Sequence, residues 1–384
     1  MRITFVISSL LGGGAERTVS NMAAYWTNKG WEITILTLFH GSAPVAYELH
    51  PKVRHIDLLS TSLPQNPRPD AASLLALRNL FDSVTPAERK AILDDIVVIA
   101  ALRHAIVKTN PDRVISFIDA TNIRVLLALH KLNFKILVSE RSDPHQVSTG
   151  REGWDLLRHR LYPLADQIIL LDQKAISFFS PKVQARCRVI TNAAFFCVTP
   201  SDKEPRPRNG EKKLLSMGRL EREKGIDFLL HAFSRVAPLH PSWSLEIWGE
   251  GPQQSLLEEL ASKLNLNERV RFRGFTHNPF QVMQGSDLFV LPSRFDGFPN
   301  VLLEALACGL PIVSFDCPFG PGQIIRHGVD GVLLPPEDVG ALIAALDRLM
   351  GDDDLRLRLA RNAPDVTQRL SVSKIMGLWE DAVR

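Results

Sequence analysis

The strongest constraint on the fold is a repeated alternation of short apolar runs and longer helical patterns. In the first half the apolar runs are ITFVISS, EITILTL, RVISFI, KILVSE and QIILLD. In the second half they are KLLSMG, SLEIWGEG, VRFRGF, LFVLPS, PIVSF and GVLLP. Runs this apolar, bounded by turn signals and separated by helices, are typical of parallel strands buried on both faces. The pattern predicts an α/β protein with two doubly wound units.

A polar, proline-rich stretch separates the two series of strands. It reads VTPSDKEPRPRNGEKK, and this composition is typical of a linker or an exposed loop. The length of 384 residues also favours two domains. We therefore expect an N-terminal domain over 1–190, a C-terminal domain over 191–366, and a terminal helix over 367–384 that packs back on the first domain. Ligands of such sheets bind at the carboxyl ends of the strands, so the chemistry is expected in a cleft between the domains.

Composition argues against several classes of protein. The net charge is +3, far from the clustered basic residues of a nucleic-acid-binding domain. No stretch approaches the roughly 18 apolar residues of a membrane-spanning helix, and the N-terminal run lacks the small-residue cleavage site of a signal peptide. The cysteines have no metal-ligand spacing, so we expect them to be reduced and structural. They are Cys187, Cys197, Cys308 and Cys317.

Three glycines follow the first predicted strand. Gly12, Gly13 and Gly14 precede a helix that is expected to begin near Ala15. Such a turn lets the backbone approach a phosphate or a sugar closely, and the N-terminus of the helix attracts anions. The pattern is neither G-x-G-x-x-G nor a phosphate-binding loop followed by Lys-Ser/Thr. A plain tight turn explains it equally well.

Two cations follow the first strand of the second half. Arg219 and Lys224 in SMGRLEREKGIDFLL flank a predicted helix start. Across a turn of this length both side chains are able to converge on one diphosphate, arginine as a fork and lysine as a point charge. The alternative is a solvated run of charges.

A second loop with the same placement is FDGFPNVLLEALACG, residues 295–309, which follows the strand LFVLPS. Gly297 permits close approach, and Pro299 favours the start of a helix. The unpaired backbone donors of its first turn are those of Asn300, Val301 and Leu302, which predict an anion site. Glu304 lies one turn further into the helix, within reach of a neutral hydroxyl such as that of a ribose.

These motifs occur in one order, and over essentially its whole length the chain resembles the retaining glycosyltransferases of family 4. The resemblance implies the GT-B fold, two Rossmann-like domains facing each other across a cleft. It rests on GGGAER, MGRLEREKG, RGF, DGFPNVLLEALACGLPIVS and GVDGVLLPP. Within that family, SFIDATN, SERSDP, LYPLAD and DCPFGP are similar to the bacterial branch that builds lipid-linked oligosaccharides and exopolysaccharides.

The resemblance implies a role for each matching position at the donor. Arg219, Lys224 and Asp296 are the expected catalytic residues, the two cations gripping the donor diphosphate and stabilising the leaving group. Asp296 stands where the family usually has glutamate, so its carboxylate is one methylene shorter. Glu304 is expected to bind the ribose. The other expected donor-binding residues are Gly13, Gly14, Phe275, Gly297, Phe298, Pro299, Asn300, Val301 and Leu302.

The resemblance also implies positions on the acceptor or donor-sugar side. These are Asp119, Asn122, Glu140 and Arg141. Relatives often carry histidine at the position of Arg141, so we do not expect catalysis to depend on that side chain.

The implied reaction transfers a hexose or an N-acetylhexosamine from a nucleotide-sugar, with a UDP-sugar favoured, to a lipid-linked saccharide. No pair of acids matches the two-carboxylate arrangement of a glycosidase, so the donor phosphate is expected to take the acceptor's proton on the face it leaves. The protein then orients the substrates and stabilises the leaving group. No cofactor and no metal are required, because Arg219 and Lys224 take the place of the metal.

The expected partners are a polyprenyl-diphosphate-linked saccharide and an anionic membrane surface, with no nucleic acid. Residues 60–110 and the helix carrying Arg151, Arg158, His159 and Arg160 are expected to meet that surface, although ordinary helices covering the sheet explain them too. The protein is expected to be cytoplasmic, at the inner face of the membrane, and a monomer or weak dimer. A sugar-nucleotide epimerase of the same fold and a non-catalytic nucleotide-sugar-binding protein remain the alternatives.

Overall fold

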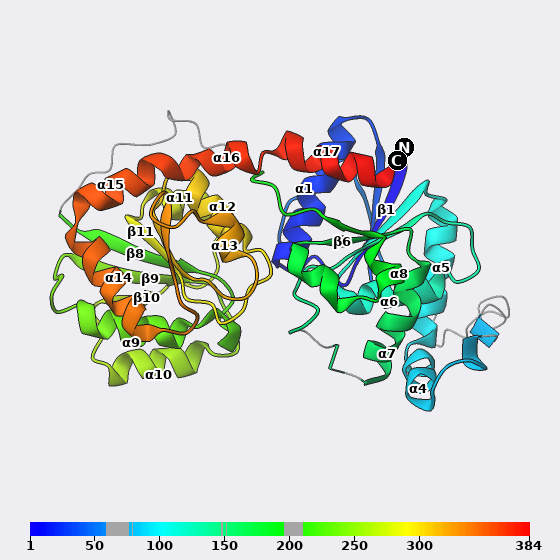
Figure 1. Cartoon of the computed structure of the whole chain (residues 1–384), viewed down its shortest axis with the longest axis horizontal. Coiled ribbons are helices and arrows are strands. Elements are labelled where there is room, and N and C mark those ends of the chain that lie inside the picture. The colour runs from blue at the N-terminus through cyan, green and yellow to red at the C-terminus, as the bar shows by residue number, and fades with distance from the viewer. Residues whose placement is uncertain (59–76, 79, 147–148, 151, 196–209) are drawn as a thin grey trace. The chain divides into compact units, whose positions relative to one another are not determined.

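Two parallel sheets, one in each of two units of the chain, carry the fold (Figure 1). The computed structural model describes residues 1–58, 77–78, 80–146, 149–150, 152–195 and 210–384. Unit 1 consists of Met1–Thr191 and Met376–Arg384, and unit 2 of Asn192–Ile375. The predicted linker lies largely in 196–209, outside the described residues.

Over its described residues, unit 1 has a seven-stranded sheet in the order β3-β2-β1-β4-β5-β6-β7, with every neighbouring pair parallel. The strands are β1 (Arg2–Ile7), β2 (Glu32–Thr37), β3 (Arg54–Asp57), β4 (Arg113–Phe117), β5 (Ile136–Ser139), β6 (Gln167–Leu170) and β7 (Cys187–Val189). The order reverses between β1 and β4, so the loops after these strands flank the point where doubly wound sheets bind ligands.

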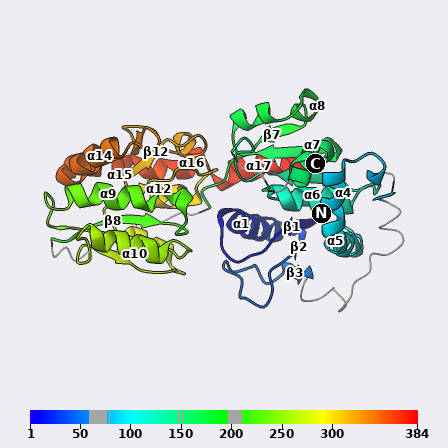
Figure 2. The ribbon, with the colours of Figure 1, turned by 90° about the horizontal axis from the view of Figure 1, so that it is seen from below.

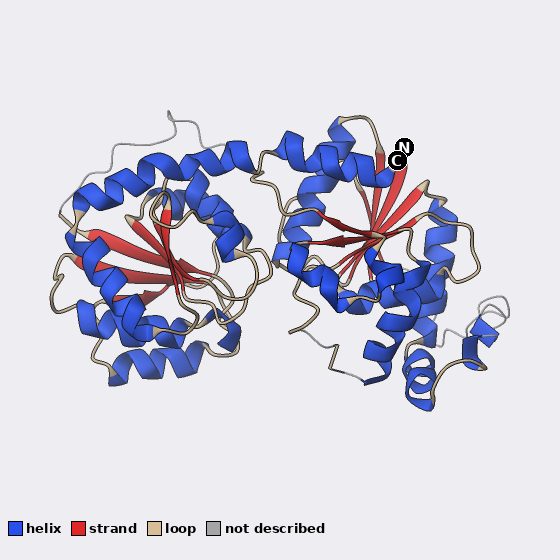
Figure 3. Ribbon diagram, in the orientation of Figure 1, coloured by secondary structure: helices blue, strands red, loops and turns tan. Residues whose placement is uncertain are grey.

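The helices of unit 1 cover both faces of this sheet, with α1 on one face and α5 and α6 on the other (Figures 1 and 3). Its main helices are α1 (Gly14–Asn28), α4 (Pro86–Asp94), α5 (Ile96–Thr109), α6 (Asp119–Ala128), α7 (Glu152–Leu161) and α8 (Pro181–Gln184). Short 3-10 helices occur at η1 (Tyr162–Leu164) and η2 (Gln173–Phe178). The long helical pattern at 86–109 is therefore two helices, because Asp95 ends α4 with a non-helical φ of −110°.

The C-terminal helix α17 (Val372–Val383) ends on unit 1. Its Trp379 packs beside Phe117, with the ring centroids 6.2 Å apart. The carbonyl oxygen of Val383 accepts a hydrogen bond from Nε of Arg113, the first residue of β4, at 2.5 Å. The end of the chain thus completes the first core.

Unit 2 has, over its described residues, a six-stranded parallel sheet in the order β10-β9-β8-β11-β12-β13. The strands are β8 (Lys212–Met217), β9 (Trp243–Trp248), β10 (Val270–Phe272), β11 (Leu288–Leu291), β12 (Ile312–Phe315) and β13 (Gly331–Leu334). Each apolar run named above is one of the strands of these two sheets. The reversal point here lies between β8 and β11.

Because crossovers between parallel strands are right-handed, the direction of winding decides which face each helix covers. The helices α9 (Ile226–Val236), α10 (Gln254–Lys263) and α14 (Val339–Gly351) lie together, and α11 (Pro279–Gln284), α12 (Asn300–Ala307) and α13 (Pro321–Ile324) lie opposite them (Figures 1 and 2). The chain continues through α15 (Asp353–Asn362), η5 (Ala363–Asp365) and α16 (Val366–Arg369).

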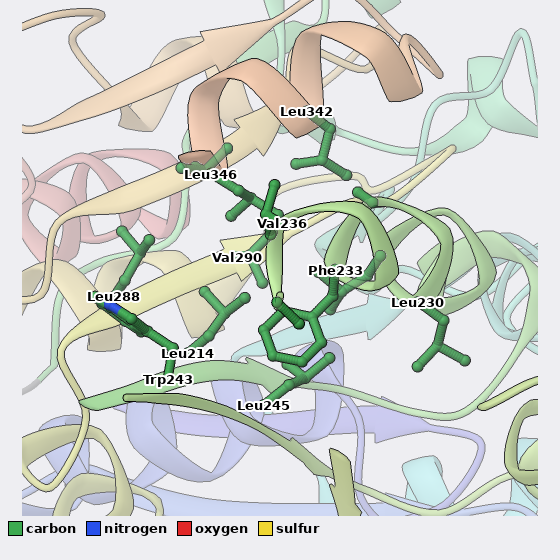
Figure 4. Close-up of a cluster of buried hydrophobic side chains, with 14 of the residues drawn as sticks. Leu214, Leu230, Phe233, Val236, Trp243, Leu245, Leu288, Val290, Leu342 and Leu346 are labelled. Carbon is green, nitrogen blue, oxygen red and sulfur yellow. The ribbon is translucent and has the colours of Figure 1, made fainter. Parts of the chain in front are cut away.

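The core of unit 2 lies between the sheet, α9 and α14 (Figure 4). Phe233 of α9 and Leu346 of α14 meet Leu214 and Leu245 of the sheet, all fully buried. Trp243 is buried with them and satisfies its indole N–H on the carbonyl oxygen of Met350 at 3.1 Å. Burial of each such side chain contributes about 1.5–3 kcal/mol to the stability of the fold. The loops at the carboxyl ends of the strands are therefore attached to a well-packed core.

Candidate functional site

The expected catalytic residues of unit 2 lie on the loops that follow β8 and β11, the two strands at the reversal point. The first loop runs through Arg219 and the short turn η4 (Arg222–Lys224) to α9. The second loop spans 292–299 and leads into α12. Neighbouring parallel strands end at the same edge of a sheet, and this brings the two loops together.

Lys224 and Asp296 form an ion pair between these loops. The Nζ atom of Lys224 lies 2.6 Å from Oδ2 of Asp296, and the two side chains are 21% and 13% exposed. The hydroxyl of Ser293 also reaches this oxygen, at 3.4 Å. Two of the three expected catalytic residues are therefore in direct contact, although 72 positions separate them in the sequence.

Arg219, the third expected catalytic residue, is far more exposed. Its side chain is 64% exposed and lies 3.1 Å from the carboxylate of Glu221. Ion pairs between exposed side chains contribute little to stability, so the guanidinium is easily transferred from Glu221 to an incoming anion.

The loop before α12 is supported by other parts of unit 2. The side-chain amide of Asn192 donates to the carbonyl oxygen of Phe298 at 3.0 Å. Gly320, with φ of 88°, packs so closely that a Cβ there would lie 2.7 Å from the carbonyl oxygen of Gly297 and 2.8 Å from Cδ of Pro299. This support fixes the backbone of the loop, and the ring of Phe298 is buried.

The start of α12 differs in one respect from the predicted anion site. The N–H of Leu302 already donates to the carbonyl oxygen of Pro299, at 3.1 Å, so the prediction of an open donor at Leu302 is wrong. A tightened first turn of this kind is a common way to satisfy a donor at a helix N-terminus. Pro299 is the N-cap residue, and Glu304, one turn further in, is almost fully buried. The roles of Asn300, Val301 and Glu304 stay predictions.

An exposed aromatic ring stands at the carboxyl end of β10. The side chain of Phe275 is 49% exposed, and its ring meets that of His277 edge to face, at 4.9 Å. The N–H of Phe275 donates to Oε1 of Glu250 at 3.4 Å, which fixes the backbone there. Such a ring offers a face on which a nucleobase can stack.

The glycine turn of unit 1 follows β1 as expected. Gly12 has φ of 115°, which favours glycine, and Gly13 is the N-cap residue of α1. A Cβ on Gly13 would collide with the carboxylate of Glu16, which folds back over the first turn. Sequence reasoning missed Glu16, although an acid three positions after an N-cap is a known signal for this arrangement. The contact of Gly13 and Gly14 with a phosphate stays a prediction.

Asn122 and Glu140, two of the expected sugar-side residues, belong to a buried polar network. Asn122 accepts from the hydroxyl of Ser116 at 2.7 Å and donates to that of Tyr162 at 3.1 Å. Glu140 accepts from the same Tyr162 hydroxyl and pairs with Arg158 at 2.8 Å. Burial raises the pKa of Glu140, against the opposing charge of Arg158, and raises that of Tyr162 well above 10.0. These contacts favour a structural role for both residues.

Asp119 and Arg141 lie nearer the carboxyl edge of the sheet. Asp119 begins α6 after β4, and its carboxylate accepts from the N–H of Ala120 at 2.6 Å. Arg141 follows β5, and its guanidinium lies 3.4 Å from the hydroxyl of Thr18 on α1, close to the glycine turn. Burial lowers the pKa of Arg141 to about 10, so the side chain remains charged at neutral pH.

The basic helix expected at a membrane buries Arg158 within unit 1, whereas His159 and Arg160 are exposed. Arg158 is buried in the pair with Glu140, and Nε of Arg160 lies 2.7 Å from Oε1 of Glu88 on α4. Arg151 lies outside the described residues. The expectation that α7 presents Arg158 to an anionic surface is therefore wrong, because the local pattern did not reveal its buried partner.

Further features of the described chain bear on metals and membranes. Cys187, Cys308 and Cys317 are free, whereas Cys197 is not described. Burial, followed by the nearby charge of Asp296, raises the pKa of Cys317 to about 12, so this thiol is not a ready nucleophile. Among the described residues, no cluster of His, Cys, Asp or Glu is placed to hold a metal, and no helix has the length and apolar character to cross a membrane.

Comparison with known proteins connects these loops to a family. Residues 199–366, which include every expected donor-binding residue of unit 2, match the family model of the glycosyl transferases group 1.

Relatives extend the similarity over the whole chain. An exopolysaccharide phosphotransferase of Streptomyces coelicolor is 29% identical over 99% of this chain, but this chain spans only 40% of that protein. A relative of Campylobacter jejuni is 26% identical over 99% of this chain and 97% of its own length. That relative is the GalNAc-alpha-(1->4)-GalNAc-alpha-(1->3)-diNAcBac-PP-undecaprenol alpha-1,4-N-acetyl-D-galactosaminyltransferase.

Solved structures show the same architecture. HepE of Anabaena, in complex with UDP, is 19% identical and has a TM-score of 0.74, covering 100% of this chain and 99% of its own. Over residues 199–366 the chain is thus similar to the glycosyl transferases group 1, and its two sheet units have the GT-B fold.

Proposed function

We propose that this protein is a retaining glycosyltransferase that moves a hexose or an N-acetylhexosamine from a UDP-sugar to a lipid-linked saccharide. The observation that carries the proposal is the Lys224–Asp296 ion pair, which joins the two loops at the reversal point of the second sheet. The UDP bound by HepE supports this choice of nucleotide.

In the proposed reaction the donor diphosphate competes with Asp296 for Lys224. A part-exposed ammonium that already holds one carboxylate can exchange it for phosphate oxygens without entering a drier environment. The planar guanidinium of Arg219 then forms bidentate hydrogen bonds with the same diphosphate. Both cations stabilise the charge that develops on the leaving UDP, a type of interaction that mutagenesis commonly values at about 2.7–4 kcal/mol.

Asp296 has a second role in the proposal. When the diphosphate holds Lys224, the carboxylate of Asp296 is released toward the donor sugar, and a hydrogen bond to a sugar hydroxyl replaces its bond to Lys224. Ser293 keeps the carboxylate oriented during this exchange. The donor phosphate takes the acceptor's proton, so neither a cofactor nor a metal takes part.

The acceptor proposal rests on the relatives. The Campylobacter relative is named for a saccharide on PP-undecaprenol, and the Streptomyces relative is named for exopolysaccharide. A lipid-linked acceptor implies that the enzyme works at the inner face of the cytoplasmic membrane. The buried arginine of α7 takes no part in that contact.

The test begins with binding. Purified protein is titrated with UDP, GDP and their sugar conjugates in a thermal-shift assay, where a specific ligand raises the melting temperature by mass action. We expect UDP and one UDP-sugar to give the largest shifts. A chain that responds to none of these nucleotides would contradict the proposal.

The second test is turnover with a radiolabelled UDP-sugar and a polyprenyl-diphosphate-linked saccharide, with and without EDTA. We expect labelled lipid product, an anomeric configuration equal to that of the donor, and the same rate in EDTA. Sugar epimerisation without acceptor would indicate the epimerase alternative, and binding without turnover would indicate a non-catalytic protein.

A further inference from the structure

Arg294 lies two residues before Asp296 and makes contacts that the proposed chemistry does not use. Its two terminal nitrogens donate to both carboxylate oxygens of Asp227, at 2.7 and 2.6 Å. Nη1 also donates to the carbonyl oxygen of Arg222 at 2.9 Å, and the guanidinium lies 3.7 Å from the ring centre of Phe228. The side chain of Arg294, on the second loop, thus contacts both η4 and the first turn of α9.

The backbones of the two loops are joined at the same place. The N–H of Arg294 donates to the carbonyl oxygen of Glu223 at 2.8 Å. Gly225, with φ of 64°, lies so close to the carbonyl oxygen of Pro292 that any Cβ would collide with it. The residues on either side of Lys224 are therefore held by residues 292 and 294 of the loop that carries Asp296.

The Arg294–Asp227 pair is rigid. The fork-to-fork geometry fixes direction as well as distance, and the ring of Phe228 limits the guanidinium to one plane. Burial raises the pKa of Asp227, but the hydrogen bond and charge of Arg294 and the backbone N–H groups of Asp227 and Phe228 together outweigh it and lower the pKa. The side chain of Arg294 itself is largely buried. These contacts direct the guanidinium toward Asp227 and away from Asp296, so its effect on the site passes through the backbone.

We propose that Arg294 is a positioning residue that fixes the backbone on both sides of Lys224, so that Lys224 and Asp296 meet the donor diphosphate in one geometry. This inference rests on the proposed function for its substrate. Lysine has a long flexible stem, so the position of Nζ depends on the anchoring of its Cα. A misplacement of about 1 Å at a reacting group is enough to cost about a hundredfold in rate.

The test compares Arg294→Gln with Arg294→Lys and with a matched control. Arg326→Gln is the control, because Arg326 also pairs with two acids of unit 2, Asp330 at 2.7 Å and Asp365 at 2.8 Å, outside both loops. The first readout is UDP affinity by calorimetry. We expect Arg294→Gln to weaken UDP binding about tenfold, Arg294→Lys to restore part of the loss, and the control to bind as the wild type does.

The second readout needs no substrate. Acetic anhydride is allowed to react briefly with the folded protein, and the acetylation of each lysine is measured by mass spectrometry. Because Lys224 is held against Asp296, we expect slow labelling in the wild type and severalfold faster labelling in Arg294→Gln. Lys263, an exposed residue of α10, serves as the internal reference.

The outcomes separate the two proposals. If the wild type binds no nucleoside diphosphate, the proposed function fails, while the labelling of Lys224 still tests the role of Arg294. If UDP affinity and Lys224 labelling are both unchanged in Arg294→Gln, the positioning role is overturned. Should that variant fail to fold, Asp227→Asn removes the negative charge and one of the two acceptor oxygens, and it is expected to change both readouts in the same direction.

Discussion

Each unit carries an ion pair that includes a residue of a loop after a strand, and the two pairs differ in their access to solvent. In unit 1, Glu140 and Arg158 are 1% and 2% exposed, and Tyr162 shares the carboxylate. In unit 2, Lys224 and Asp296 are both partly exposed and join two loops. A buried pair has no route to exchange partners, whereas a part-exposed one can pass its cation to a ligand. The comparison suggests that unit 1 uses its pair for stability and unit 2 for binding.

The largest effect on stability is expected from Arg158→Ala. Removing the arginine leaves the Glu140 carboxylate buried without its counter-charge, a change that typically costs about 3–5 kcal/mol. The loss should be smallest at acid pH, where Glu140 binds a proton in both states, and should grow as the pH rises. Urea unfolding at several pH values measures this. The control is Arg160→Ala on the same helix, whose partner Glu88 keeps the hydrogen bonds of its capping box with Thr85. If Arg158→Ala and Arg160→Ala lowered the free energy of unfolding equally, the larger role given to the buried Glu140–Arg158 pair would be contradicted.

The largest effect on activity is expected from Lys224→Ala. Without the ammonium at the leaving group we expect turnover to fall by about 10²–10³-fold, with little change in stability. The transfer assay with labelled donor measures the rate. The control is Lys212→Ala, which breaks a similar ion pair with Asp353 in the same unit, at 2.6 Å. A near-normal rate for Lys224→Ala would overturn the site assignment.

The elements of this fold were largely predictable because their signals are local. A strand buried on both faces must be apolar along its whole length, and each such run is a strand. The strands that sequence reasoning missed are β3 and β7, which lie at the two edges of the first sheet. Most of β3 and all of β7 are exposed or half-buried, so neither strand has to be apolar along its length.

The site was less predictable because its contacts join distant parts of the chain. The family motifs identified Lys224 and Asp296 separately, but their pairing depends on the order of strands in the sheet. The sequence around Arg158 shows a basic helix, while its acid lies on a loop after another strand. The role of Arg294 depends on Asp227, 67 positions earlier. Local patterns reveal which residues are charged and leave their partners undetermined.

Two glycines, one in each unit, extend the comparison to the backbone. Gly225→Ala places a Cβ against the carbonyl oxygen of Pro292 at a positive φ, where strain of about 1–3 kcal/mol is expected. At Gly13→Ala the three atoms nearest the new Cβ belong to the carboxylate of Glu16, the far end of a side chain, and Gly13 has an extended φ of −160°. Thermal unfolding should show a much larger loss for Gly225→Ala, together with weaker UDP binding. A larger loss for Gly13→Ala would contradict this assignment of strain.

The smallest expected effect is the dependence of stability on acid that Asp227 gives to unit 2. The pKa of Asp227 in the folded state lies below its ordinary value of 3.8, because burial, which raises it, is outweighed by the hydrogen bond and charge of Arg294 together with two backbone N–H groups. The unfolded chain therefore binds a proton at Asp227 more readily than the folded chain does. The contribution of this group to stability is complete above pH 3.8 and is lost as the pH falls through the lower, folded pKa.

Urea unfolding of the wild type and of Asp227→Asn measures this contribution directly. The variant should be less stable than the wild type at pH 6, and the difference should shrink as the pH is lowered below 3.8. The matched variant Asp353→Asn tests the assignment, because Lys212 and Arg356, which lower the pKa of Asp353, lie outside the loops that carry Lys224 and Asp296. Both variants should show the same trend in stability, and only Asp227→Asn should weaken UDP binding. If Asp353→Asn weakened UDP binding equally, the weaker binding would reflect the general stability of unit 2. The proposed role of the Arg294–Asp227 pair would then be contradicted.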